Sequence, residues 1–283
     1  MKKLILLITI SFACFSIHAQ KKTKVKGNKV IVTDTRTFDY FTRIELNDEI
    51  EIELKHGNSA KLEIEADENL HEVIESDISN GALVLSLNKR ITSSKKLNLT
   101  LYVDDLDYIE LNDESEIKGV DPFKFFGMEL VLNNKSLLEI QFETQNLIVE
   151  SNEKARGKFI VKADSVTVDA KESSKLEFDL NAEKLVVDAY GSSTSEFVGK
   201  VALLNVTAND NATFKGPNLV STNATVIALN KSDTYINSKN ELEITAKNKA
   251  EVYIFNKPTI LVKLLADEAT LFKRESMTLF ERL

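Results

Sequence analysis

Carboxylates are the most abundant side chains in this sequence that could do chemistry. Aspartate and glutamate account for 44 of the 283 residues. Asp104, Asp105 and Asp107 lie close enough along the chain to supply several oxygen ligands to a calcium ion. Glycoside hydrolysis would instead need two carboxylates at a set separation within a cleft, which a linear sequence does not place. Because runs of charge usually mark solvated faces, we predict that the protein holds no metal and is not an enzyme.

The other residue types give cofactor chemistry little support. His56 and His71 remain beyond the N-terminal segment, and they lack the His-x-x-x-His spacing of a zinc site. The sequence contains neither a phosphate-binding loop nor a dinucleotide-binding glycine motif, and its one cysteine, Cys14, lies in that N-terminal segment. We therefore predict that the protein uses no cofactor.

Residues 1–19 have the pattern of a secretory signal peptide. Lys2 and Lys3 precede an apolar run over 4–17, and Ala19 follows it. The run is too short to cross a bilayer, so we expect no transmembrane segment. A lipoprotein acylated at Cys14 is a less favoured alternative, because the residues before that cysteine match such a site poorly. We predict export to the periplasm or the cell surface.

The charge of the remaining chain excludes some classes of partner. Without the signal peptide, 34 basic residues face 44 acidic ones, which gives a net charge of −10. Nucleic acids and anionic membranes bind basic surfaces, so we predict neither as a partner. Residues 20–36 are rich in lysine and hydrophilic, and we predict a flexible basic leader there.

A repeat of about nineteen residues organises the chain from Leu111 onward. Each unit carries a short polar motif that ends in serine or alanine. These small residues lie at 115, 136, 155, 174, 193, 212, 232, 250 and 269. Apolar and polar residues alternate on both sides of the motif, which indicates strands. The spacing is too short for a crossover helix, so we predict an all-β parallel solenoid built from stacked coils.

The motif itself predicts a sharp corner between two strands. Its middle residue is Asp, Asn or Gly in six of eight units, and these residues tolerate a left-handed backbone. Glu153 and Glu172 are the exceptions. The small residue that ends the motif would fit the narrow interior of the bend, and serine hydroxyls there could bond backbone groups.

The segments on either side of the repeats follow the same pattern less closely. Residues 37–106 alternate more loosely, and the hexapeptide at 44–49 recurs at 109–114. We predict that this N-terminal half is a diverged copy of the coil geometry or a β cap leading into it. Residues 107–283 would form the solenoid, and Phe272 to Leu283 is the candidate C-terminal cap because an open coil exposes its edge strands.

The order of these features resembles the head GIN domain family, whose members are described as auto-transporter adhesins exported by Bacteroidetes. The resemblance covers residues 37–265 and rests on five segments. They are Phe38–Leu46, Leu62–Leu70, Ile78–Leu85, Asp188–Phe197 and Glu251–Pro258. It implies a single-chain, right-handed β-helix-like fold with two related halves. The sequence departs from the family in placing Asn, Asp and Lys at corners where glycine is usual.

A non-enzymatic binding surface is the function that these observations favour. Outward side chains recur at fixed heights along a solenoid, so many weak contacts to a glycan or envelope polymer could add up. The candidate binding residues lie at and after the corners: Asn134, Lys135, Asn152, Lys154, Tyr190, Asn230, Lys231, Asn248 and Lys249. A homo-oligomeric envelope scaffold is one alternative, and a polysaccharide-active β-helix enzyme is the other.

Overall fold

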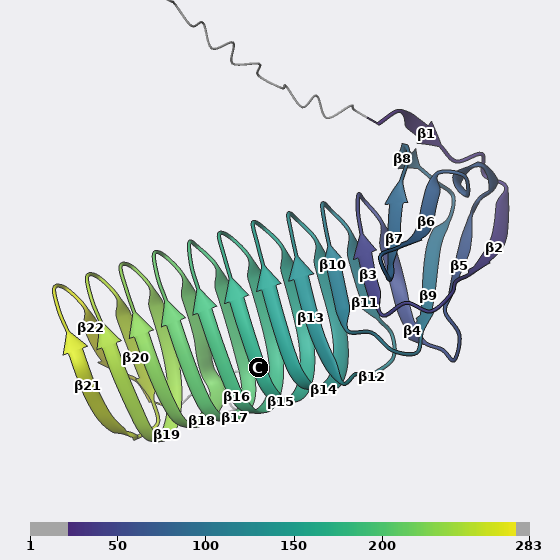
Figure 1. Cartoon of the computed structure of the whole chain (residues 1–283). Helices are drawn as coiled ribbons and strands as arrows, with labels where there is room; N and C mark the ends of the chain where they lie inside the picture. Colours follow the sequence, from purple (N-terminus) through teal and green to yellow (C-terminus); the bar gives the residue numbers. More distant parts are fainter. Residues whose placement is uncertain (1–21, 276–283) are drawn as a thin grey trace, which may run out of the picture.

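The computed structural model describes residues 22–275 as a stack of about 9 β coils closed at one end by a small antiparallel cap (Figure 1). The coils run from the cap to the C-terminal end in sequence order. No helix in the described part is long and apolar enough to cross a membrane. The proposed signal peptide over 1–19 lies outside the described residues.

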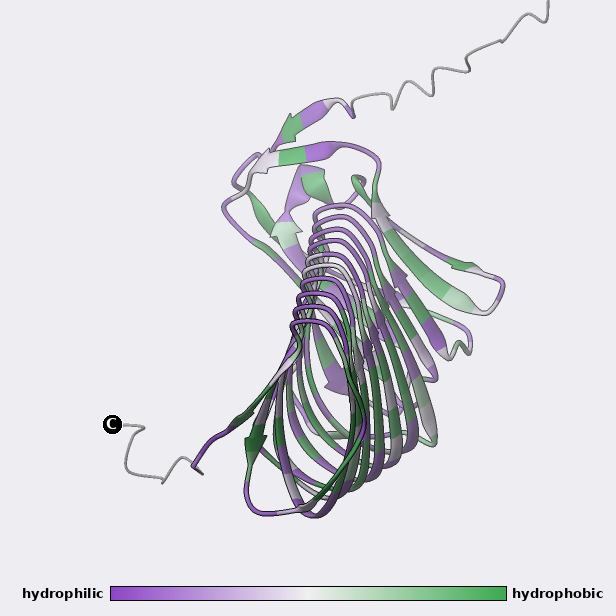
Figure 2. Ribbon diagram, turned by 90° about the vertical axis from the view of Figure 1, so that its left-hand side faces the viewer, coloured by the Kyte–Doolittle hydropathy of each residue, from purple (hydrophilic) through white to green (hydrophobic). Residues whose placement is uncertain are grey.

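A regular coil is one long strand that curves around a rounded bend and ends at a sharp corner. Six strands have this form: β14 (Leu137–Ser151), β15 (Arg156–Ala170), β16 (Lys175–Ala189), β17 (Thr194–Ala208), β18 (Thr213–Ala228) and β19 (Asp233–Ala246). Viewed from the C-terminal end, the coils superimpose as one flattened loop, narrow at the corners and wider at the bends (Figure 2). The predicted strand–corner–strand unit is therefore confirmed, with the strand hydrogen-bonded continuously around the opposite bend.

Parallel pairing at the repeat spacing holds neighbouring coils together. Phe159 pairs with Phe178, and Leu147 pairs with Val166, each nineteen positions along the chain. Repeats that are longer or shorter than nineteen residues are accommodated by changes within single coils. β18 has 16 residues and β19 has 14, and the register between them shifts after Gly216. The first long repeat is instead broken into β11 (Glu116–Gly119), β12 (Phe123–Lys124) and β13 (Gly127–Leu132).

Side chains that point inward form continuous columns along the core. Phe159, Phe178, Phe197 and Phe214 stack with ring centroids 4.7, 4.7 and 5.3 Å apart. All four are at most 2% exposed. Each ring covers the next because parallel register places equivalent residues about 4.8 Å apart, which is close to the distance at which aromatic rings stack.

The corners confirm the prediction of a left-handed backbone. The middle residue has a φ of 56–62° wherever it is not glycine from Asp113 to Asp267, and Gly191 has a φ of 70°. Glu153 and Glu172 adopt this conformation too, although glutamate is disfavoured there. The middle carbonyl then accepts a hydrogen bond from the next coil, as from Lys154 N–H to Asn134 O at 2.8 Å. The ladder between coils is thus continued through the corner.

The small residues that end each motif fill the inside of the corners. Ala155, Ser174, Ser193, Ala212 and Ser232 are all fully buried. Their hydroxyls do not form the bend as expected: within the described part, the Oγ atoms of Ser174, Ser193 and Ser232 have no hydrogen-bond partner. The backbone N–H of each of these serines donates instead to the carbonyl three residues earlier. Small volume is therefore the property that this position requires.

The N-terminal half contains both of the structures that were expected as alternatives. Strands β3 (Arg43–Leu46) and β4 (Glu51–His56) stack in register on β10 (Tyr108–Leu111) and β11, so the repeated hexapeptide marks two stacked coils. Beyond them, β7 (Ala82–Leu87) and β9 (Leu97–Val103) continue the parallel stack and pair antiparallel with the cap. The cap consists of β1 (Lys24–Lys26), β2 (Ile31–Thr37), β5 (Lys61–Asp67), η1 (Glu68–Leu70), β6 (Ile74–Ser79) and β8 (Arg90–Ser93).

The prediction of a flexible leader over 20–36 is wrong for most of that segment. β1 (Lys24–Lys26) pairs with β8, and β2 (Ile31–Thr37) pairs with β5. The fully buried Asp67 carboxylate accepts hydrogen bonds from the backbone N–H groups of Lys29, Lys95 and Lys96 at 3.1–3.2 Å. Burial raises the pKa of Asp67, and these three N–H groups more than offset it, so the net pKa is lowered. The lysine-rich composition of this segment did not predict its pairing with the cap, because that pairing depends on residues far along the chain.

The opposite end of the stack exposes its last strands. β20 (Glu251–Phe255) is followed by β21 (Thr259–Leu265) and β22 (Thr270–Lys273). Every residue of β21 is exposed. Phe272 of the predicted cap lies in β22, whereas Met277, Leu279, Phe280 and Leu283 lie outside the described residues.

The left-handed glutamates generate a testable prediction about stability. Replacing Glu172 with glycine removes the steric cost of a φ of 57° and increases the freedom of the unfolded chain. We expect Glu172→Gly to raise the free energy of unfolding by up to about 1 kcal/mol, measured by urea denaturation. Glu177→Gly is the matched control, because it places glycine within a strand and should destabilise the protein. A less stable Glu172→Gly variant would contradict this account of the corner.

Candidate functional site

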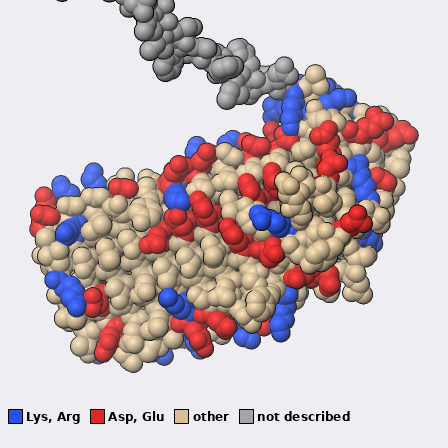
Figure 3. Space-filling model, in the orientation of Figure 1, with Lys and Arg blue, Asp and Glu red and all other residues tan. Residues whose placement is uncertain are grey.

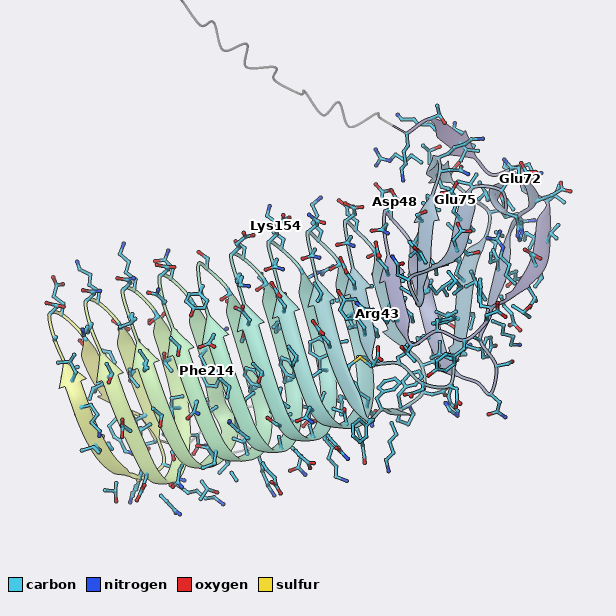
Figure 4. The ribbon with its side chains drawn as sticks, in the orientation of Figure 1. Arg43, Asp48, Glu72, Glu75, Lys154 and Phe214 are labelled. Carbon is cyan, nitrogen blue, oxygen red and sulfur yellow. The ribbon has the colours of Figure 1, made fainter. Side chains whose placement is uncertain are left out.

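The corners align along one long edge of the molecule and form what we call the corner ridge, residues 47–49 through 266–268 at one corner per coil (Figures 1 and 4). Where this ridge meets the N-terminal cap there is an open groove of about 780 Å³. It is lined by Lys22, Asp48, Glu49, Leu87, Lys89, Arg90, Asp113, Glu114, Asn134, Lys135, Glu153, Lys154, Glu172 and Ser173. Three of the nine predicted binding residues, Asn134, Lys135 and Lys154, therefore come together in one groove.

The predicted asparagines are engaged in hydrogen bonds between coils. Asn152 Nδ2 donates to Asn133 Oδ1 at 2.9 Å, and Asn133 Nδ2 donates to Asn112 Oδ1 at 2.8 Å. Asn248 Nδ2 donates to Asn230 Oδ1 at 2.7 Å in a second ladder farther along the ridge. These amides stabilise the stack, so their capacity to bind a ligand is largely used.

Asn134 is also tied to its neighbours within the groove. Its Oδ1 accepts the Asp113 backbone N–H at 2.9 Å, and its Nδ2 donates to Glu153 Oε2 at 2.9 Å. Because both ends of the amide are occupied, Asn134 shapes the groove wall more than it offers free hydrogen-bonding groups.

Four lysines of the corners, Lys135, Lys154, Lys231 and Lys249, are predicted binding residues, and these four ridge lysines have different surroundings. Lys135 forms an ion pair with Glu114, and Lys249 pairs with Glu268 at 3.4 Å. Within residues 22–275, Lys154 and Lys231 form no ion pair, and Figure 4 shows Lys154 pointing away from the coils. Their ammonium groups are the most available among these four lysines.

Most charges in the groove compensate one another across elements. Lys22 pairs with Asp48, and Arg90 pairs with Glu49 at 3.1 Å, so the cap is joined to the first corner. Lys135 lowers the pKa of Glu114, which raises the pKa of Lys135 in return. A ligand that enters this groove would exchange these surface ion pairs for contacts of its own, at little cost because exposed pairs are weak.

Tyr190 lies in the same ridge but outside the groove. Its side chain is partly exposed, and burial together with the Asp188 and Asp169 carboxylates raises its pKa. Those carboxylates belong to an acidic column on the flat sheet below the ridge, where Glu150 and Asp169 both pair with Lys171 at 3.0 and 2.7 Å. Figure 3 shows acidic side chains gathered over these middle coils.

The three calcium candidates do not come together as one group of ligands in the described residues. Residues 22–275 contain no group of three or more His, Cys, Asp or Glu side chains that could hold a metal ion. Asp104 and Asp105 line a second groove on the opposite edge, at the bends, and Asp107 is not among the residues that line it.

Two carboxyl groups with a raised pKa lie outside both grooves. Burial raises the pKa of Glu116 and of Asp233, and a neighbouring carboxylate on each adds to the shift: Glu51 for Glu116 and Glu251 for Asp233. Neither residue lines the ridge groove or the bend groove.

Sequence reasoning missed the cap residues of the ridge groove, Lys22, Lys89 and Arg90. Asp48 could have been found, because the repeated hexapeptide aligns it with Asp113 in the next coil. The cap residues carry no such signal, since they reach the groove through strands that lie outside the repeat.

Comparison with known proteins finds a matching family and solved structures with a similar fold. A family described as "Putative auto-transporter adhesin, head GIN domain" matches residues 40–258. A structure described as a "putative adhesin" from Parabacteroides merdae shares 15% identity at a TM-score of 0.65, covering 89% of this chain and 99% of its own. A "Putative lipid binding protein" from Parabacteroides distasonis shares 13% identity at a TM-score of 0.64, covering 89% and 100%.

A third structure, described as a "putative adhesin" from Bacteroides fragilis, shares 15% identity at a TM-score of 0.54 and covers 89% of this chain and 99% of its own. At these identities the likeness shows the fold and not the ligand. No curated protein matches the chain.

The asparagine ladder predicts that Asn152 is needed for stability. Replacing it with leucine removes the donor to Asn133 Oδ1, which costs about 1 kcal/mol for a hydrogen bond of this kind. We expect Asn152→Leu to lower the urea midpoint accordingly, while Lys154→Ala, at an exposed position in the same corner, leaves it unchanged. Equal midpoints for Asn152→Leu and the wild type would show that the ladder adds nothing to stability.

Proposed function

This chain belongs to the head GIN domain family, and from that premise we propose that it is an exported, adhesin-like protein that binds a glycan or another envelope polymer and catalyses no reaction. The family description supports export to the cell surface or envelope. Within the molecule, the corner ridge is the surface that supports binding best.

The observation that carries this proposal is the spacing of lysines on the ridge. Lys135 and Lys154 follow one another in adjacent coils, and so do Lys231 and Lys249. At about 4.8 Å per coil, the two pairs lie roughly 19 Å apart on the same edge. A polymer with repeated acceptor groups could contact both pairs at once, and simultaneous weak contacts would add up to useful affinity.

The groove beside the cap supports a preferred point of attachment. It joins Lys135 and Lys154 to Lys22, Lys89 and Arg90 of the cap, beside six carboxylates of the corners. Because exposed ion pairs contribute little to stability, these groups can turn to a ligand without disturbing the fold.

Charge reversal of the four ridge lysines tests the proposal. We expect the Lys135→Glu, Lys154→Glu, Lys231→Glu, Lys249→Glu variant to lose at least about tenfold in affinity for the polymer that the wild type binds on an array of bacterial and host polysaccharides. The matched control reverses four exposed lysines away from the ridge, Lys118, Lys175, Lys184 and Lys215, for the same change in net charge. Thermal unfolding of both variants checks that the fold is intact.

Equal losses in the two variants would trace binding to net charge and not to the ridge. An unchanged profile in the ridge variant, or a wild-type protein that binds no polysaccharide on the array, would contradict the proposal.

The exposed last strand favours a second candidate function, an envelope scaffold that self-associates. β21 presents Ile260, Leu261, Val262, Leu264 and Leu265, which are 39–52% exposed at the end of the stack. An exposed apolar strand is a template for pairing with another chain. Pairing of the same strand from two chains would be symmetric and would give a closed dimer.

Sedimentation velocity tests this second candidate. We expect the mass of the wild-type protein to rise toward that of a dimer with concentration, and Leu261→Lys, Leu264→Lys to hold it at that of a monomer. Ile148→Lys, at an exposed position on the middle coils, is the control. A wild-type protein that remains monomeric at all concentrations would exclude the scaffold built on β21.

A further inference from the structure

The rounded bends form a trough on the edge opposite the corner ridge. Its volume is about 810 Å³, and it runs across successive coils beside the loop that carries Asp104 and Asp105. Parallel register assigns its residues to three columns. The floor is Phe125, Thr144, Ala163 and Ala182; one wall is Lys124, Glu143, Lys162 and Asn181; the other is Phe126, Gln145, Asp164 and Glu183.

The hollow has a physical cause in the bend itself. The floor residues turn inward where the strand curves, and Thr144 and Ala163 are 8% and 7% exposed. Because these side chains are small, the longer side chains on either side rise above them as walls. The trough is thus a product of the backbone and would keep its shape without a ligand, which lowers the cost of binding.

Phe126 stands at the N-terminal end of this trough with 75% of its side chain exposed. Its backbone is held in place: its carbonyl accepts the Gln145 N–H at 3.1 Å and the Thr144 hydroxyl at 3.2 Å. The adjacent Phe125 is buried and stacks on Phe123 at 5.4 Å. The held backbone thus presents an exposed aromatic ring at the mouth of a trough that is otherwise lined mainly by polar side chains.

The outward aromatic residues of the last coils are arranged differently from Phe126. Tyr235, Tyr253 and Phe272 stack on one another with centroids 4.4 and 4.9 Å apart, so each covers the face of the next. No such stacking involves Phe126 within the described part, and a face of its ring is available.

The charges of the trough restrict the ligand. Its lining carries five carboxylates, Asp104, Asp105, Glu143, Asp164 and Glu183, against the two cations Lys124 and Lys162. Lys162 is paired with Glu143 at 3.4 Å, so the remaining potential is negative. Uronic acid polymers, phosphates and anionic lipid surfaces are therefore disfavoured, whereas neutral or cationic groups are accepted.

We propose that this trough binds a neutral or amino-sugar saccharide chain lying along the solenoid axis. The Phe126 ring would pack against the C–H face of one sugar, since the negative face of an aromatic ring attracts hydrogens with partial positive charge. Gln145 and Asn181 amides and the carboxylates of Asp164 and Glu183 would bind hydroxyl or ammonium groups of the following sugars, where the coils repeat every 4.7–4.9 Å. The site lies on the edge opposite the corner ridge, so it goes beyond the ridge lysines and can fail or succeed independently of them.

Isothermal titration calorimetry with three hexasaccharides of equal length tests the proposal. The probes are neutral β-1,4-linked N-acetylglucosamine, cationic glucosamine and anionic galacturonate. We expect the full-length mature protein to bind the first two and not the third. Phe126→Ala should weaken binding roughly tenfold, Phe126→Trp should retain it, and the control Ile148→Ala, at an exposed apolar position on the flat sheet, should leave it unchanged.

Two further measurements separate the parts of the site. Asp164→Asn, Glu183→Gln should weaken binding of the glucosamine oligomer more than that of the N-acetylated one, because only the former carries ammonium groups. Reversal of the four ridge lysines should leave both affinities unchanged, so loss of ridge binding and loss of trough binding can be told apart. No binding of either oligomer by the wild type, equal affinity of Phe126→Ala, or preference for galacturonate would overturn the proposal.

Discussion

Hydrogen bonding between coils, in a register that survives the corner, is the constraint on which the rest of this structure depends. A parallel solenoid must turn its chain sharply once per coil and still pair every backbone group with the next coil. The left-handed residue at the middle of each corner makes this possible, because its carbonyl then lies along the stacking direction and accepts an N–H such as that of Lys154. The ladder is unbroken through the corner, so Glu153 and Glu172 accept a conformation that glutamate disfavours.

Because the register is constant, equivalent side chains of successive coils line up in columns and interact with one another. Inside, the same rule stacks Phe159, Phe178 and Phe197 and confines the corner interior to serine or alanine. Outside, it aligns asparagines into a ladder and places lysines or carboxylates at repeated heights. A ladder of amides stabilises the stack, whereas exposed lysines on the ridge or a trough between polar walls can meet a ligand. The two long edges differ because one is a tight corner that exposes its middle residues and the other is a wide bend that buries small ones.

The two ends of the stack are unlike, and this asymmetry matters for assembly and binding. At the N-terminal end, antiparallel strands and the buried Asp67 carboxylate close the coil and bring Lys22 and Arg90 against the first corners. At the C-terminal end, β21 exposes a whole apolar strand. Along the length of the stack, the regular surface is broken where the repeat is interrupted. The first long repeat carries extra residues before Phe123, and its broken strand leaves Phe126 standing outside the regular surface.

The sequence by itself determined everything that depends on periodicity: parallel coils of about nineteen residues, the corner positions with left-handed backbone, the small residues inside them and the stacking of the repeated hexapeptide. These features follow from the repeat, because each residue pairs or packs with equivalent residues at a fixed separation along the chain. Tertiary structure alone decided that the lysine-rich segment before Phe38 forms strands and that Phe126 lies at one end of a trough. It also decided that Asn152 takes part in a hydrogen-bonded ladder, while Lys154 forms no ion pair within residues 22–275. These outcomes depend on antiparallel pairing, on the exact partner of each amide and on the curvature of the backbone, and no repeat in the sequence encodes them.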